Sequence, residues 1–110
     1  MVRIFVQTLS YMKLLDEKNI TGLQEMIEDI ILKNPHAGDV IPGLGGLRKL
    51  RVADPNRKKG KRGGLRILYL DVPKRELIYL IYLYGKDESE NISNDVKKRI
   101  FTLVKAIKGE

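Results

Sequence analysis

The side chains of this sequence that could do chemistry are cations and tyrosines, and the cations are concentrated in one segment. Residues 48–66, RKLRVADPNRKKGKRGGLR, contain nine of the 21 Lys and Arg residues and one acid, Asp54. The other 91 residues contain 12 bases and 13 acids, so the formal net charge of +7 comes from this segment. Charge concentrated in this way predicts a polyanionic partner that is bound at one place.

Some of these cations alternate with apolar residues, which is the pattern of a half-buried strand. Lys49 and Arg51 fall on one face of the expected strand, with Leu50 and Val52 on the other. Arg66 begins the next expected strand. A strand fixes the direction of its side chains, so these cations should project from one face of a sheet.

Tyrosines follow on a further expected strand, residues 77–84. Tyr82 and Tyr84 share one of its faces, and Lys86 continues the same alternation. Cations hold phosphates and phenol rings stack on bases, so this combination favours a nucleic acid. The alternative is a solvated basic loop that confers solubility, which fits residues 57–61 but not the cations of the strands.

The same groups could also catalyse RNA cleavage. Clustered cations stabilise the extra negative charge of a phosphorane-like transition state. RNA supplies its own nucleophile, the 2′-hydroxyl, so the protein needs to add alignment, charge stabilisation and proton transfer. A lysine crowded by other cations, or Tyr84, could transfer the proton.

Other site chemistries have little support. The sequence has no cysteine, which excludes disulfides, a thiol nucleophile and Cys-ligated zinc. The single histidine, His36, follows an expected helix in a turn, and we expect no catalytic role for it. Asp87, Glu88 and Glu90 precede an expected helix, where acids are common, so we expect no metal. GLGG at 43–46 lacks the Walker and dinucleotide patterns, and no cofactor is expected.

The elements that must position these residues follow the order β, α, α, β, β, β, α in one domain, residues 1–110. The expected strands are residues 2–8, 47–53, 65–71 and 77–84. The expected helices are a weakly signalled one at 11–18, one that starts at a capping box of Thr21 and Gln24 and ends near Pro35, and a C-terminal one capped by Ser93. Short turns between strands predict an antiparallel sheet with helices on one side, an α+β fold.

No apolar run approaches the roughly 20 residues that span a bilayer. We therefore expect a cytoplasmic protein without a membrane partner.

Five short motifs occur in a characteristic order along the chain. They are GDVI at 38–41, GGLRK at 45–49, GKRGG at 60–64, Arg66, and YGK at 84–86. In this order and spacing they resemble the HigB-type branch of the RelE/ParE toxin superfamily, over nearly the whole chain. The resemblance implies a RelE-like α+β fold: a twisted antiparallel sheet of about four strands, N-terminal helices packed on one face, and a C-terminal helix.

The resemblance also implies a function. Toxins of this kind belong to type II toxin–antitoxin systems, and those of the RelE-like branch cut mRNA on the ribosome without a metal, through the RNA 2′-hydroxyl. The implied partners are the ribosome with its mRNA and a cognate antitoxin, often a helix-turn-helix protein, through which the complex reaches operator DNA. Two alternatives stay open: a non-catalytic RNA- or ribosome-binding module, and a ParE-like gyrase inhibitor.

Individual roles are implied residue by residue. Arg66 matches the strand arginine at the scissile phosphate, and Lys49, Arg51 and Lys86 match basic positions of the same site. The position that aligns with the catalytic tyrosine of RelE is Ser93, so Tyr84 is the candidate for that role. The expected RNA-binding residues outside the catalytic group are Arg48, Arg57, Lys58, Lys59, Lys61, Arg62 and Tyr82.

Overall fold

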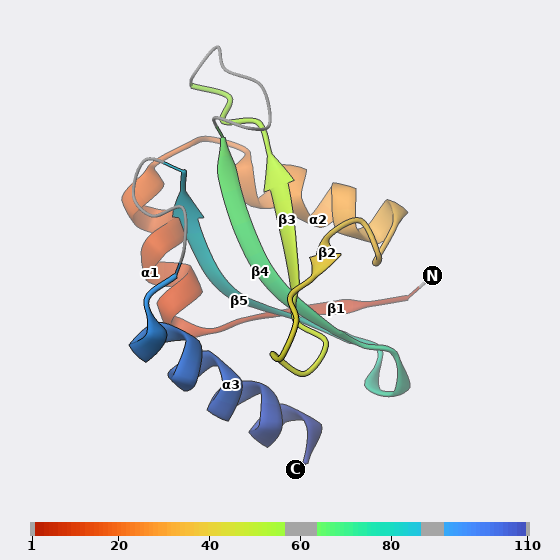
Figure 1. The fold of residues 1–110 in the computed structure, drawn as a ribbon. Helices are drawn as coiled ribbons and strands as arrows, with labels where there is room; N and C mark the ends of the chain where they lie inside the picture. Colours follow the sequence, from red (N-terminus) through yellow and green to blue (C-terminus); the bar gives the residue numbers. More distant parts are fainter. Residues whose placement is uncertain (1, 57–63, 87–91, 110) are drawn as a thin grey trace.

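A five-stranded mixed sheet forms the centre of the molecule (Figure 1). The computed structural model describes residues 2–56, 64–86 and 92–109. The strands are β1 (Ile4–Gln7), β2 (Asp39–Val40), β3 (Arg48–Val52), β4 (Leu65–Val72) and β5 (Leu77–Gly85), in the spatial order β1-β5-β4-β3-β2. Neighbours from β2 to β5 are antiparallel, whereas β1 pairs with β5 in parallel.

The prediction of about four antiparallel strands is wrong in two details. The short strand β2 lies between the expected helix that ends near Pro35 and the expected strand at 47–53, and the sequence does not predict it because two residues carry no readable alternation. The strand β1 is parallel to β5. A parallel pair needs a long connection between its strands, and here the chain from β1 to β5 includes two helices and three other strands.

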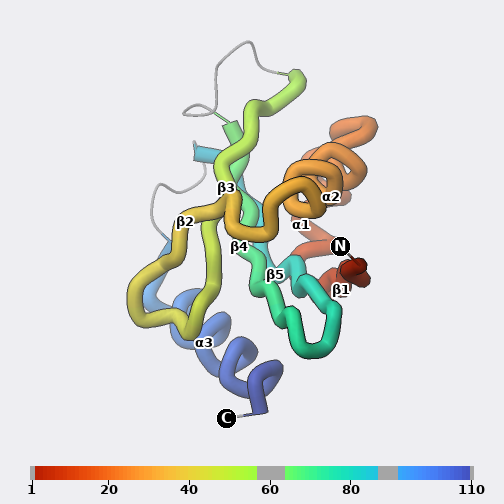
Figure 2. Tube along the Cα trace, turned by 90° about the vertical axis from the view of Figure 1, so that its right-hand side faces the viewer, coloured from red at the N-terminus to blue at the C-terminus, as the bar shows by residue number. Residues whose placement is uncertain are grey.

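The helices form layers on both sides of the sheet, as the nearly edge-on view in Figure 2 shows. Helices α1 (Leu9–Lys18) and α2 (Leu23–Lys33) cover one face, and α3 (Asn94–Lys108) packs on the other. The prediction of helices on one side is therefore wrong for α3. The reason lies in β4 and β5, whose residues Leu68, Leu70 and Ile81 make the second face apolar as well, so that face must also be covered. None of the described helices has the length and hydropathy of a membrane span.

The start of α2 differs from the predicted capping box. Gly22, with φ 78°, is the N-cap, and no side chain caps the helix there. Gln24 instead accepts a hydrogen bond from the hydroxyl of Tyr11 at 2.6 Å and donates one to Glu28 at 2.7 Å. The buried phenol needs a partner, and it takes the amide that the sequence pattern assigned to the helix end. The end of α2 at Lys33 and the Ser93 cap of α3 are confirmed.

An irregularity in β5 changes which residues share a face. The register shifts between Leu68 and Tyr69, so that Leu68 pairs with Tyr82 whereas Tyr69 pairs with Leu80. Ile81 is the extra residue of this bulge, and its carbonyl accepts a hydrogen bond from the Thr8 hydroxyl at 2.9 Å. The same hydroxyl caps α1, so one side chain fixes both the helix start and the bulge.

A buried tyrosine ties β2 to the centre of the sheet. The hydroxyl of Tyr69 accepts from the N–H of Gly38 at 3.0 Å and donates to the carbonyl of Pro35 at 2.7 Å. A Cβ at position 38 would lie 2.9 Å from the Tyr69 ring and 3.0 Å from the carbonyl group of Lys49, so the close approach requires glycine. The segment between α2 and β2 is thereby held against β4.

Replacing Tyr69 with phenylalanine tests this anchor. The Tyr69→Phe variant leaves a buried N–H and a carbonyl without their partner, so we expect a loss of about 1–3 kcal/mol in the free energy of unfolding. Urea denaturation measures it. Tyr79→Phe removes a half-buried hydroxyl on the same pair of strands and is the matched control. An equal loss in both variants would contradict the anchor.

Candidate nucleic-acid interface

Three predicted site residues form a row across the central strands. Arg51 of β3 pairs with Arg66 of β4, and Arg66 pairs with Tyr84 of β5. Paired Cα atoms of neighbouring antiparallel strands lie about 5 Å apart, so the row spans about 10 Å. All three side chains lie on the face opposite α1 and α2, as the alternation predicted for the cations.

A second row lies beside the first. Asp39 pairs with Lys49, Lys49 with Leu68, and Leu68 with Tyr82. The rings of Tyr82 and Tyr84 are 6.1 Å apart between centroids and inclined by 49°. The bulge at Ile81 brings them to this face, because an unbroken alternation along β5 would place both with Ile78 and Leu80, which face α1 and α2.

The sequence did not indicate Asp39, which joins this site. Its carboxylate lies 3.5 Å from a guanidinium nitrogen of Arg51, and both side chains are largely exposed. Residue 39 lies in the motif GDVI, but neither charge nor alternation there indicated a site residue. The pairing with Lys49 places an acid at the rim of a cationic face.

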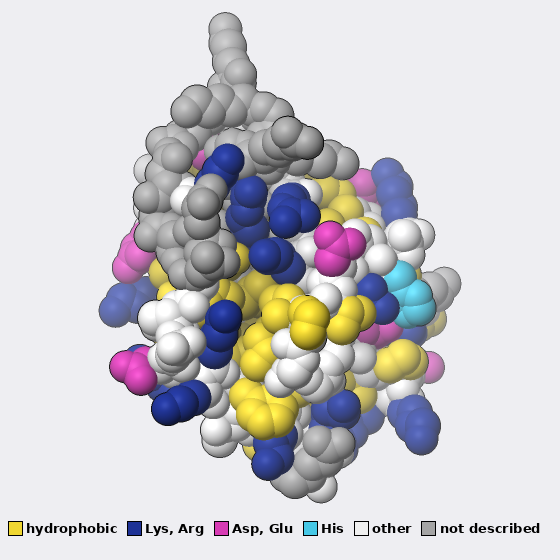
Figure 3. Space-filling model, viewed as in Figure 1, with side chains coloured by type: hydrophobic (Ala, Val, Ile, Leu, Met, Phe, Trp, Pro, Cys, Tyr) yellow, Lys and Arg dark blue, Asp and Glu magenta, His cyan; other side chains and the backbone are white. Residues whose placement is uncertain are grey.

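Exposure decreases along the first row. The side chain of Arg51 is 45% exposed, whereas Arg66 is 9% and Tyr84 is 4% exposed. The Arg66 guanidinium donates to the carbonyl of Gly64 at 3.2 Å, which fixes its direction. Two arginines directly opposite one another repel, and this cost to stability is typical of a surface arranged for an anion. Figure 3 shows Lys and Arg side chains gathered on this face, near the upper ends of β3 and β4.

The position of Tyr84 in the row changes the pKa of its phenol. Burial raises its pKa above the ordinary value, and the charges of Arg66 and Arg51 partly oppose this effect. The cross-strand pairing of Arg51, Arg66 and Tyr84 is what places both guanidinium groups near this phenol. At neutral pH the phenol keeps its proton and can act as a hydrogen-bond donor.

Other predicted residues lie apart from the two rows. Arg48 shares the parity of Leu50, so it faces away from Lys49, and its guanidinium donates to the carbonyl of Gly38 at 2.7 Å. It also partly opposes the rise that burial causes in the pKa of Tyr69. Its predicted RNA contact is therefore not part of this face.

Lys86 follows β5, half-buried, and its N–H donates to the carbonyl of Gly64 at 3.2 Å. It thus lies at the same end of the sheet as Arg66. His36 is exposed in the turn after α2, as predicted. The predicted RNA-binding residues Arg57, Lys58, Lys59, Lys61 and Arg62 lie outside the described residues.

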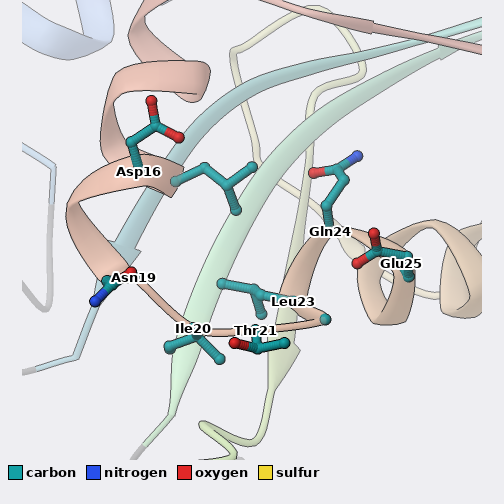
Figure 4. Close-up of a pocket in the computed structure, with 9 residues that line it drawn as sticks. Asp16, Asn19, Ile20, Thr21, Leu23, Gln24 and Glu25 are labelled. Atoms are coloured by element: carbon teal, nitrogen blue, oxygen red, sulfur yellow. The ribbon is translucent and has the colours of Figure 1, made fainter.

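Between the two N-terminal helices, the structure offers no competing site for a polyanion. One pocket of about 250 Å³ lies between α1 and α2 and is lined by Asp16, Gln24 and Glu25 but by no cation (Figure 4). The two carboxylates come from different helices and do not point toward one another. In the described part of the chain, no group of three or more His, Asp or Glu side chains is arranged to hold a metal ion.

Comparison with known proteins identifies the fold. No protein-family model matches this chain. Among solved structures, it is similar to a free-state mutant of the Escherichia coli toxin RelE in which two arginines are replaced by alanine. The sequences are 18% identical, the similarity covers 89% of this chain and 98% of the RelE chain, and the TM-score is 0.56. The chain therefore has the predicted RelE-like fold.

The convergence of Arg66 and Tyr84 can be tested by titration. In Arg66→Met a positive charge beside the phenol is lost, so the pKa of Tyr84 should rise further. NMR of tyrosine labelled with ¹³C at Cζ measures it, and Tyr84→Phe assigns the signal. Arg48→Met is the control, since it should raise the pKa of Tyr69 and leave Tyr84 unchanged. An unchanged Tyr84 in Arg66→Met would show that the two groups do not converge.

Proposed function

We propose that this chain is the toxin of a type II toxin–antitoxin system, of the HigB-type branch of the RelE/ParE superfamily, and that it inhibits translation by cutting mRNA on the ribosome. The observation that carries the proposal is the row Arg51, Arg66 and Tyr84 on a RelE-like sheet. Two guanidinium groups and a phenol, carried by residues whose Cα atoms span about 10 Å, match the needs of a phosphodiester better than those of a neutral ligand.

The reaction uses the 2′-hydroxyl of the substrate as nucleophile. Its oxygen attacks the adjacent phosphorus and loses its proton to solvent water, the bond from phosphorus to the 5′-oxygen breaks, and the products are a 2′,3′-cyclic phosphate and a 5′-hydroxyl. Arg66 and Arg51 stabilise the added negative charge on the phosphorane oxygens. Tyr84 is protonated at neutral pH, as a phenol with an ordinary or a raised pKa is, so its role is to donate the proton that the leaving 5′-oxygen needs.

Arg51, at the exposed end of the first row, and Lys49, in the second row beside it, receive the substrate. The ion pair of Arg51 with Asp39 is exposed, and such pairs contribute little to stability. A phosphate can therefore replace the carboxylate at small cost, and Asp39 keeps Arg51 oriented until it does. Lys86 adds positive charge at the buried end.

The partners follow from this role. The ribosome presents the message, and a cognate antitoxin neutralises the toxin and, with a DNA-binding part, carries the complex to operator DNA. The site of action is the cytoplasm. A ribosome-binding module without catalysis would co-sediment with ribosomes and leave the message intact, and a ParE-like protein would inhibit gyrase instead.

Truncation of Arg66 is the direct test of the activity. We expect Arg66→Ala to reduce cleavage of translated mRNA by two to three orders of magnitude, because a buried charge on the reacting phosphate is lost. Primer extension on message recovered from a translation reaction measures the cuts. Lys13→Ala, at an exposed position of α1, is the control and should cut normally. Full cleavage by a folded Arg66→Ala variant would refute the proposal.

The role of Tyr84 is tested separately. Loss of the hydroxyl in Tyr84→Phe should lower the single-turnover cleavage rate about 10²-fold to 10⁴-fold, as expected for a proton donor. Ribosome binding should be unchanged, because the ring remains. Tyr79→Phe controls for loss of a hydroxyl elsewhere on β5. Normal cleavage by Tyr84→Phe would assign proton transfer to another group.

A further inference from the structure

Helix α3 carries a second cationic surface that the charge distribution along the chain concealed. Residues 92–109 contain five Lys or Arg residues and one acid, Asp95. The formal charge summed over all residues outside 48–66 is near zero, because acids elsewhere in the chain cancel the cations of this helix. The positive charge of the protein therefore has two locations in space and not one.

The cations lie on the outer side of the helix. Ile100, Val104 and Ile107 face the sheet and are buried. Lys98 and Lys105 are seven residues apart, so they lie on the same side of the helix, about 10 Å from one another along its axis. Thr102 lies between them and is exposed. The outer side is thus a straight cationic edge with a hydroxyl at its centre.

Two flanking cations widen this edge. Lys97 and Arg99 are exposed beside Lys98. Within the described part of the chain, no carboxylate forms an ion pair with any of the four outer cations, Lys97, Lys98, Arg99 and Lys105. Phe101 is 38% exposed, and the ammonium of Lys105 lies 5.4 Å from the centre of its ring.

An ordinary solvated helix face does not have this composition. Exposed helices usually mix charges of both signs, because like charges near one another destabilise a helix. Residues 2–38, which include α1 and α2, follow that rule with four bases and five acids. The helix layers on the two sides of the sheet therefore differ in charge, and the cationic one shares its side with Arg51 and Arg66.

The position of α3 relative to the catalytic row defines what it could bind. It packs on the same sheet face through Leu68, Leu70 and Tyr84. Its outer side therefore faces the same side of the molecule as the two rows. Figure 3 shows further Lys and Arg side chains over α3, below those near the ends of β3 and β4. A ligand on α3 would lie beside a strand of RNA held at Arg66.

We infer that the outer side of α3, formed by Lys97, Lys98, Arg99 and Lys105, binds the phosphate backbone of folded ribosomal RNA. The inference rests on the proposed function, which brings the protein to the ribosome. Spaced point charges on a rigid helix recognise a backbone by position and not by base sequence. The message occupies the sheet, and the neighbouring ribosomal RNA occupies the helix.

The experiment compares two double variants of equal net charge. Lys98→Gln/Lys105→Gln removes two cations from α3, and Lys13→Gln/Lys33→Gln removes two exposed cations from α1 and α2 on the other side of the sheet. Affinity for purified ribosomes is measured by co-sedimentation at several salt concentrations. The α3 variant should bind more weakly and lose about one unit of salt slope for each phosphate contact removed, whereas the control should match the wild type.

A second arm separates this inference from the catalytic proposal. Binding of a short single-stranded RNA should be equal in both double variants, because the message site is untouched. Equal losses of ribosome affinity in the two variants, no loss in either, or no ribosome binding by the wild type would overturn the inference. Ribosome binding that depends on α3, without any cut in the message, would instead support the inference and refute the endonuclease.

Discussion

The structure depends on a central strand that is buried on both faces. Six consecutive residues of β4, from Leu65 to Leu70, are buried, and they alternate between the two apolar clusters of the molecule. Burial on both faces requires a helix layer on each side. Arg66 is the one charged residue in this run. Arg66 is the second residue of β4, on the face that α3 covers, and its guanidinium donates a hydrogen bond to the carbonyl of Gly64.

The cationic face is a compromise between stability and binding. Arg51 and Arg66 are direct cross-strand partners, and like charges in that relation cost free energy. Asp39 offsets part of this cost at the exposed end through its ion pair. A strand pair selected for stability alone would have an apolar or oppositely charged residue at one of these positions. A bound phosphate between the two guanidinium groups would offset the repulsion between them.

The sequence predicted the long elements and the cations well, because their patterns are local. Alternation of Lys49 and Arg51 with Leu50 and Val52 specified β3 and its exposed face, and this is confirmed. The features that failed depend on distant contacts. The side of the sheet taken by α3, the partner of Gln24 and the two-residue strand β2 are each decided by packing against segments far away in the chain. Asp39 was missed for the same reason, because the pairing of β2 with β3 is what brings its carboxylate near Arg51.

The bulge at Ile81 decides which face of the sheet the two tyrosines of the site occupy. The two tyrosines lie with Arg66 because one extra residue is accommodated between Leu80 and Tyr82, where Thr8 holds its carbonyl. Side chains of a strand alternate with a period of two, so the same residues in an unbroken strand, without the bulge, would turn both rings toward α1 and α2 without changing a polar group. The orientation of the two phenols therefore depends on a backbone irregularity and on the Thr8 hydroxyl that holds it, and not on the side chains of β5 alone.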